Sequence, residues 1–227
     1  MDLIEAIRTR KTIRAFKPDP VPQSVLREIL DEARNSPSWG NTQPWEFAVV
    51  SGSQLEEIKK GYLEKGDSES AMEAGEPPDK PEPYLSRGRH QGQKEHELLG
   101  ITHDDEKGRA WWRSQNFSNY GAPCVIYLLT ERAYHFHNKG INVWPVYDCG
   151  VISQTIMLLA TNYGLGTVVQ ASAVRHPDII RKVIGIPKSK VILIGIAIGY
   201  PDWTARITAF RSDKEPLDTL VKWYGFT

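Results

Sequence analysis

The chain has 227 residues, and its 28 Lys plus Arg balance 28 Asp plus Glu, so the formal net charge is zero. This length suits one large domain with a substantial core, and we expect a single domain over residues 1–227. The balanced charge does not indicate binding to nucleic acid or to an anionic membrane surface. No apolar run approaches the roughly 20 residues of a membrane span, and the start has no signal-peptide pattern. We therefore expect a cytoplasmic protein.

The two cysteines, Cys124 and Cys149, lie among apolar residues with no histidine at metal-ligand spacing. This pattern predicts buried thiols and a reducing compartment. His135 and His137 are two residues apart, but no carboxylate or cysteine completes a metal site, so we interpret them as loop histidines and expect no metal.

The first informative stretch is residues 8–14, Arg-Thr-Arg-Lys-Thr-Ile-Arg, which carries four positive charges. Three apolar residues just before it recur at helical spacing, which predicts a helix with a buried stripe. They are Leu3, Ile4 and Ile7. Arg10 and Arg14 offer planar forks for phosphate oxygens, and Thr12 offers a hydroxyl between them. The alternative is a solvated basic helix end, since cations are favourable near a helix C-terminus.

The spacing of apolar residues and the positions of prolines and polar residues predict the next elements in chain order. Prolines make residues 16–22 a rigid connector. The elements that follow are a helix over 22–33, a polar loop, a strand over 45–50 and a surface helix over 53–62. Residues 66–83 are polar and include four prolines, Pro77, Pro78, Pro81 and Pro83. This composition predicts a long excursion of the chain away from the core elements. Helices over 84–101 and 104–117 would complete a variable lid or insert over residues 66–118 that selects acceptors.

The second half of the chain alternates strands and helices. We predict strands over 124–130, 167–171 and 191–198, and helices over 146–163 and 177–183. This order favours an α+β or α/β sandwich with a mixed central sheet flanked by helices. The C-terminal extension, residues 200–227, carries apolar residues that need a partner surface, from the same domain or from a second subunit.

The second informative stretch is the loop Pro-Ser-Trp-Gly-Asn-Thr-Gln-Pro-Trp over residues 37–45. This loop joins a helix end to a strand and consists mainly of small and amide residues. Its Ser38, Asn41 and Gln43 can contact the edge of a heteroaromatic ring. An ordinary polar turn is the alternative, because turns use the same residue types.

Together, the two stretches resemble the FMN-dependent nitroreductase family. Arg10-Lys-Thr-Ile-Arg14 matches its Arg-x-Ser-x-Arg/Lys pattern, with Thr12 in place of the usual serine, and the loop matches its Pro-Ser-x-x-Asn-x-Gln-Pro-Trp pattern. The resemblance extends over nearly the whole chain, through Gly164-Leu-Gly-Thr167, Ile186-Pro-Lys and Gly199-Tyr-Pro. Residues 84–89, 98–101 and 223–226 are most similar to the subgroup that reduces nitrobenzoates and dinitroanilines. The family fold implies a mainly antiparallel sheet and a C-terminal extension that packs on a dimer partner.

The resemblance also implies which residues bind FMN. At the ribityl phosphate these are Arg10, Thr12 and Arg14, with Lys11 beside them and Arg211 or Lys214 from the tail. Lys214 stands in the place of an arginine and lacks its bidentate fork. The residues that line the isoalloxazine ring are Pro37, Ser38, Trp39 and Asn41. Gln43 would reach the flavin of its own or of the other subunit. The backbone groups that contact the ring belong to Val169, Gln170, Ala171 and Ser172.

Three further residues are candidates for substrate binding. Arg87 and Arg89 would either bind a substrate carboxylate or lie on the solvated face of a helix. Trp111 would either stack on an aromatic substrate or fill a core, and the same two roles are open to Trp112 and Trp144.

The function implied by the resemblance is that of a homodimer with FMN at the subunit interface. A hydride would pass from NADH or NADPH to flavin N5 and then to an electron-poor acceptor, first of all a nitroaromatic, in a ping-pong cycle. The cofactor carries this chemistry, so no protein catalytic residue is named. Four alternatives stay open: enone reduction, reductive dehalogenation, non-catalytic FMN binding, and a phosphate or nucleic-acid binding module.

Overall fold

Four strands form one central sheet in the order β1-β2-β6-β5, and every neighbouring pair is antiparallel. The strands are β1 (Glu46–Ser51), β2 (Cys124–Glu131), β5 (Gly166–Gln170) and β6 (Lys190–Gly199). The computed structural model describes residues 1–75 and 79–226, so the predicted turn residues Pro77 and Pro78 lie outside the described residues. The sheet confirms the predicted α+β class and its mainly antiparallel pairing.

Helices surround this sheet, and the predicted ones are present with small changes of boundary. They are α1 (Leu3–Thr9), α2 (Gln23–Ala33), α3 (Gly52–Lys65), α4 (Tyr84–Leu99), α5 (Glu106–Phe117), α6 (Arg132–His135), α7 (Trp144–Asn162), α8 (Pro177–Ile184) and α9 (Leu217–Leu220). Short 3-10 turns include η1 (Trp39–Asn41) and η3 (Ser172–Val174), and a small hairpin joins β3 (Phe136–His137) to β4 (Gly140–Ile141).

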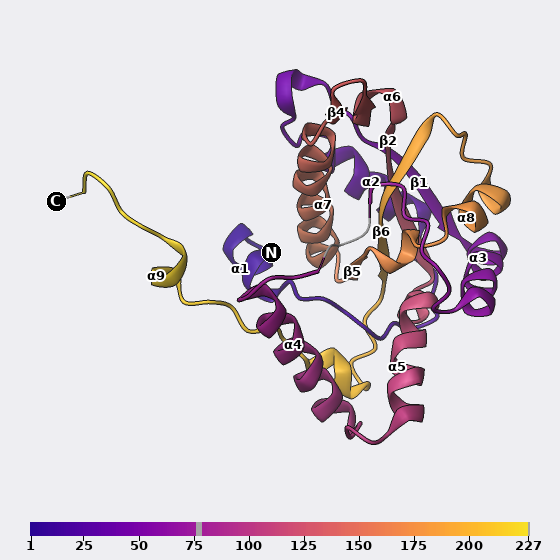
Figure 1. The fold of residues 1–227 in the computed structure, drawn as a ribbon, viewed down its shortest axis with the longest axis vertical. Coiled ribbons are helices and arrows are strands. Elements are labelled where there is room, and N and C mark those ends of the chain that lie inside the picture. Colours follow the sequence, from indigo (N-terminus) through magenta and orange to yellow (C-terminus); the bar gives the residue numbers. More distant parts are fainter. Residues whose placement is uncertain (76–78, 227) are drawn as a thin grey trace.

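The side chains of β2 alternate between two apolar cores. Val125 and Tyr127 face the core shared with α3, α5 and α8. Ile126 and Leu128 face the opposite core, shared with α2 and α7. Figure 1 shows α7 and α3 on opposite sides of the sheet. The period of two in the strands thus produces a helix, sheet, helix sandwich.

The segment after α1 runs beside β5, at the edge of the sheet. Thr12 forms a parallel bridge to Thr167, and the Ile13 N–H donates to the Thr167 carbonyl at 3.0 Å. Further along, the Lys17 N–H donates to the Tyr200 carbonyl at 2.8 Å. This segment adds a parallel contact to an otherwise antiparallel sheet and fixes the register of residues 10–14 against β5.

The predicted buried stripe of α1 is wrong. Leu3, Ile4 and Ile7 are 66%, 54% and 48% exposed, and Ala6 is the only buried residue of the helix. Helix α1 contacts α7, yet its larger apolar side chains face outward. An amphipathic pattern shows that an apolar face exists, and not which surface covers it.

The described part of the predicted excursion is tied to the body of the protein. The Ala71 N–H donates to the Arg175 carbonyl at 2.9 Å, and the Glu73 carboxylate binds Arg132, Arg181 and the Ile192 N–H. The helices after it, α4 and α5, lie together at one end of the molecule (Figure 1). Asp105 caps α5 by accepting from the Gly108 N–H at 2.9 Å.

The C-terminal tail is paired with α4 through Asp213 and Glu215, and Figure 1 shows it then extending away from α4. Its large apolar side chains are exposed: Leu217, Leu220, Trp223, Tyr224 and Phe226. Within residues 1–75 and 79–226, no helix combines the length and apolar character needed to cross a membrane.

Candidate functional site

A cationic cluster forms where the N-terminal segment meets the start of the tail. Burial lowers the pKa of Arg10, and the neighbouring Arg211 guanidinium lowers it further. The same two causes lower the pKa of Lys11, whose ammonium lies 5.3 Å from the centre of the Trp203 ring. A guanidinium nitrogen of Arg211 donates to the Arg8 carbonyl, which holds its side chain in place.

No acid balances this cluster within the described residues, because their ion pairs involve none of Arg10, Lys11 and Arg211. Partly buried cations that repel one another make a donor set suited to a phosphate. Of the residues predicted to bind the phosphate, Arg10, Lys11 and Arg211 gather here, whereas Lys214 and Arg14 have other partners.

The tail residue beside this cluster is Arg211. Lys214 lies farther along, in a cavity of ≈ 410 Å³ between the tail and α4. The acids on either side of Lys214 bind α4: Asp213 pairs with Lys94, and Glu215 pairs with Arg87 at 2.8 Å. These ion pairs fix the course of the tail, so Lys214 stays beside α4.

Arg14 makes a contact that the sequence does not reveal. Its guanidinium pairs with the Glu95 carboxylate of α4 at 3.0 Å, and both side chains are largely buried. The positive charge of Arg14 is therefore balanced, whereas that of Arg10 is not. In the parallel register set by Thr12 and Thr167, Arg14 is level with Val169.

The end of β5 presents the predicted ring-binding backbone. Val169 and Ala171 are exposed, whereas Gln170 is buried and held from behind. Asn119 donates to the Gln170 side chain at 3.1 Å, and Gln170 donates to the Asn116 carbonyl at 3.2 Å. Hydrogen bonds from α5 and the turn after it thus fix the strand end.

A close approach of two backbones also fixes the turn after β5. Gly195 of β6 lies under η3, where an added Cβ would stand 2.7 Å from the Ala173 Cβ. Glycine therefore allows residues 172–174 to pack directly on the sheet. This places Ser172 at the strand end, where its hydroxyl donates to the Asn116 side chain at 3.4 Å.

The loop over residues 37–45 is a rigid turn. Gly40, Asn41 and Gln43 all have positive φ, at 56°, 55° and 45°. The Ser38 hydroxyl accepts from the Gln43 N–H at 2.9 Å, and the Gln43 amide donates to Asn41 at 3.3 Å. Asn41 and Gln43 are exposed, as is Pro37. The loop thus displays amide groups on a constrained backbone.

The loop is anchored on the N-terminal part of α7. The Trp39 N–H donates to buried Asp148 at 3.1 Å. The Trp39 ring is 57% exposed and lies nearly parallel to the Trp144 ring, at 14° and 6.4 Å between centroids. The cationic cluster lies at the other end of α7, where Arg10 and Thr161 line one cavity.

Asp148 and Thr161 are 13 positions apart on one helix, which corresponds to roughly 20 Å at 1.5 Å per residue. Two stretches that we expect to bind the same cofactor thus lie at opposite ends of α7 in a single chain.

The substrate candidates lie on the α4 and α5 side. The Arg87 side chain is engaged by Glu215 and lies over the Tyr84 ring at 5.7 Å. Arg89 is exposed, and Trp111 is exposed with its ring 5.9 Å from that of Trp112. Trp112 is buried, in keeping with the core role weighed for it.

The two histidines do not lie in a loop, as the sequence suggested, because His135 ends α6 and His137 belongs to β3. His135 is buried, and burial lowers its pKa. Among the described residues, no three histidine, cysteine or acidic side chains gather as a metal ion would require.

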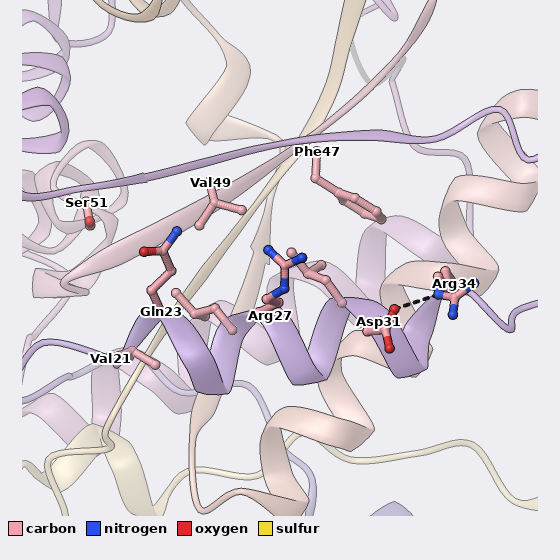
Figure 2. Close-up of a pocket in the computed structure, with 10 residues that line it drawn as sticks. Val21, Gln23, Arg27, Asp31, Arg34, Phe47, Val49 and Ser51 are labelled. Carbon is pink, nitrogen blue, oxygen red and sulfur yellow. Dashed lines mark hydrogen bonds and ion pairs between the residues drawn. The ribbon is translucent and has the colours of Figure 1, made fainter.

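A further cavity lies apart from all these residues. It measures ≈ 630 Å³ and runs between α2 and the edge strand β1. Figure 2 shows Phe47 and Val49 of β1 lining it opposite Val21 and Gln23 at the start of α2. None of the predicted FMN-binding residues lines this groove.

Comparison with known proteins gives consistent matches. Residues 7–200 match the Nitroreductase family. The chain is 29% identical to 4-nitrobenzoate reductase of Pseudomonas putida, over 99% of this chain and 96% of that protein. It is 28% identical to the FMN and NADPH-dependent nitroreductase NfnB from Sphigopyxis sp. strain HMH, with a TM-score of 0.91 and complete coverage of both chains. NfnB from Mycobacterium smegmatis, solved in complex with NADPH, is 25% identical with a TM-score of 0.88 over 97% of each chain.

Proposed function

The chain belongs to the nitroreductase family, and on that premise we propose that it is an FMN-dependent oxidoreductase that uses NADPH or NADH to reduce a nitroaromatic acceptor. The observation that carries this proposal is the unbalanced cationic cluster of Arg10, Lys11 and Arg211. Such a cluster costs stability unless an anion joins it, and the FMN phosphate is an anion of suitable chemistry. The residues present therefore fit the cofactor.

The remaining contacts would orient the ring. Residues 10–14 run parallel to β5, so a phosphate at Arg10 would place the rest of the cofactor towards Val169 and Ala171. The exposed backbone of this strand end offers hydrogen-bonding groups to a flat ring. Arg10 and Arg211 would hold the phosphate in this arrangement, and the Thr12 hydroxyl would offer it a further hydrogen bond.

A second copy of the chain would complete the site. The loop of residues 37–45 and the cationic cluster lie at opposite ends of α7 in one chain, so the loop that meets a given FMN would come from the other subunit. The exposed apolar stripe of α1 and the exposed apolar tail provide surfaces for such a dimer. The free edge of β1 and the groove in Figure 2 offer the partner's tail a place to dock.

Bound FMN would supply the two-electron step, by accepting a hydride from the reduced nicotinamide and passing it to the acceptor. In the conversion of a nitro group to a nitroso group, the nicotinamide loses a hydride and the acceptor gains that hydride and a solvent proton and releases water. The chain's own residues bind, orient and shield the reactants. The exposed rings of Trp39 and Trp111 are suited to contact flat acceptors.

Purification followed by anaerobic titration tests the proposal. We expect a yellow protein with one FMN per chain, loss of flavin absorbance when NADPH or NADH is added, and its return when 4-nitrobenzoate follows. A protein that takes up no FMN would contradict the proposal. A flavin that stays oxidised would support non-catalytic FMN binding instead.

The acceptor is tested separately, because enone reduction and reductive dehalogenation remain alternatives on the same scaffold. The reduced protein is mixed anaerobically with 4-nitrobenzoate, a cyclic enone or a halogenated phenol. We expect the nitroaromatic to reoxidise it fastest. Faster reoxidation by either of the other two would redirect the assignment.

A further inference from the structure

Helix α4 is held to the rest of the protein by a buried acid. Glu95 is its only buried residue, at 7% exposed, although the helix has 16 residues. A buried carboxylate is costly unless it is paired and hydrogen-bonded. Glu95 meets this requirement on three sides. It pairs with Arg14 at 3.0 Å, and it accepts from Gln91 at 2.6 Å and from the Trp112 indole at 3.3 Å.

The partner of Glu95 lies at the proposed ring end of the cofactor site. Arg14 is four positions beyond Arg10 on the segment that runs parallel to β5, and it is level with Val169. A side chain as long as arginine has several rotamers, and loses that freedom only where a partner holds it. Among the described residues, Glu95 is the one acid that pairs with the Arg14 guanidinium.

Tyr120 lies beside Arg14, and hydrogen bonds continue from Tyr120 to the strand end. Burial raises the pKa of the Tyr120 hydroxyl, and the neighbouring Arg14 guanidinium acts in the opposite direction. The Tyr120 hydroxyl donates to the Asn116 side chain at 2.8 Å, and the Asn116 carbonyl accepts from Gln170 at 3.2 Å. Arg14 therefore stands between α4 and the turn that supports β5.

We propose that Glu95 is a positioning residue, which holds the Arg14 guanidinium at the end of β5 so that its positive charge faces the isoalloxazine ring of FMN. This rests on the proposed function. It assigns to α4 a part in the redox chemistry of the cofactor, because a fixed cation favours the negative charge that a flavin gains on reduction. The carboxylate itself touches neither cofactor nor acceptor.

The midpoint potential of bound FMN tests this role through its sign. Removing the Glu95 charge alone would raise the potential, whereas releasing Arg14 from its position would lower it. Both effects occur in Glu95→Ala. If Glu95 acts by positioning Arg14, the release of Arg14 is the larger effect, so we expect Glu95→Ala to lower the potential and to weaken FMN binding. Glu95→Gln keeps an oxygen acceptor for Arg14 and Trp112, so its potential should equal or exceed that of the wild type.

The Arg14→Ala background is the matched control. There Glu95→Ala should no longer lower the potential, because no guanidinium is left to misplace. Should Glu95→Ala fail to fold, Glu95→Asp replaces it: the charge stays, the reach shortens, and the potential should fall. The experiment uses the FMN-loaded protein, a redox dye titration, and fluorescence titration of the apoprotein with FMN.

The measured potentials and the FMN binding of these variants support or overturn the positioning role. A potential at or above the wild-type value in Glu95→Ala or Glu95→Asp overturns the positioning role, as does a lower potential in Glu95→Gln. If the wild-type protein binds no FMN, the proposed function fails and this inference fails with it. If FMN binds normally and only these shifts are absent, the proposed function stands and this inference alone is wrong.

Discussion

The backbone N–H of Trp39 donates to the carboxylate of Asp148, joining residues 109 positions apart in the chain. Asp148 is buried on α7, so this bond fixes the loop of residues 37–45 to the helix that supports it. Asp148→Ala would leave the N–H without a partner, at a cost of about 1.5–3 kcal/mol in the free energy of unfolding. We expect a lower urea midpoint and weaker FMN binding.

The Asp148 prediction has two controls. Asp148→Asn keeps a carbonyl oxygen that accepts a hydrogen bond, so its loss should be smaller. Asp19→Asn changes an exposed acid and should leave both the urea midpoint and FMN binding unchanged. An Asp148→Ala protein with the wild-type midpoint would show that the bond does not stabilise the loop.

Arg10 gives a prediction in which stability and binding change in opposite directions. Burial and the Arg211 charge disfavour its cationic form in the ligand-free chain. Arg10→Ala should therefore leave the apoprotein as stable as before or more stable. It should also remove a charge-assisted bond worth roughly 1.5–3 kcal/mol, which weakens FMN binding about 10- to 150-fold.

Fluorescence titration with FMN measures the Arg10 effect on binding, and thermal unfolding of the apoprotein measures its effect on stability. Arg8→Ala is the matched control, since Arg8 is exposed on α1 and contributes only its backbone carbonyl to Arg211. If Arg10→Ala destabilises the apoprotein and binds FMN normally, the cluster has a structural role instead.

Much of the architecture was predictable because it follows from local periodicity. The continuous apolar runs of β2 and β6 and the helical spacing of α2 identify elements that any compact fold must bury. The two motif stretches, residues 10–14 and 37–45, were predictable for a similar reason, since each is contiguous. The same local pattern could not say what covers α1, whose stripe of Leu3, Ile4 and Ile7 is exposed.

The polar contacts within the site were not predictable, because each joins distant segments. Asp148 lies in an otherwise apolar helix and Glu95 in a polar one, and nothing beside either residue names its partner. The choice between Arg211 and Lys214 likewise depends on Asp213 and Glu215, whose partners are on α4. These residues acquire their roles only when the chain folds.

Glu73 predicts how stability depends on acid. Burial alone would raise the pKa of its carboxyl, but the Ile192 N–H and the Arg181 and Arg132 side chains outweigh burial and hold the pKa below the ordinary value of 4.5. The ionised carboxylate therefore stabilises the fold above pH 4.5. This contribution is lost as the pH falls through the folded-state pKa.

Glu73→Gln should lower the free energy of unfolding at pH 7 by about 1.5–3 kcal/mol, since it weakens charged hydrogen bonds. The difference from the wild type should narrow at acidic pH, where Glu73 is protonated. Urea unfolding at several pH values measures both effects. Glu69→Gln, an exposed acid in the same segment, should show neither. A difference that stays constant with pH would mean that charge is not the cause.

The C-terminal tail gives a prediction about assembly. Its apolar side chains, among them Leu217, Leu220 and Trp223, are exposed in a single chain and belong to neither core. A chain ending at Pro216 should therefore fold, since both cores are intact. It should also lose the proposed dimer, or dissociate at higher protein concentration, because the apolar surface proposed to join the subunits is gone.

Light scattering coupled to size exclusion measures the mass of the shortened chain, and flavin absorbance measures its FMN. We expect both to fall together, since the loop of residues 37–45 that completes each site comes from the other subunit in the proposed dimer. A full-length chain with Leu217, Leu220 and Trp223 changed to serine separates apolar contact from mere length, and it should behave like the shortened chain. A shortened chain that stays dimeric with full FMN would place the interface on α1 and not on the tail.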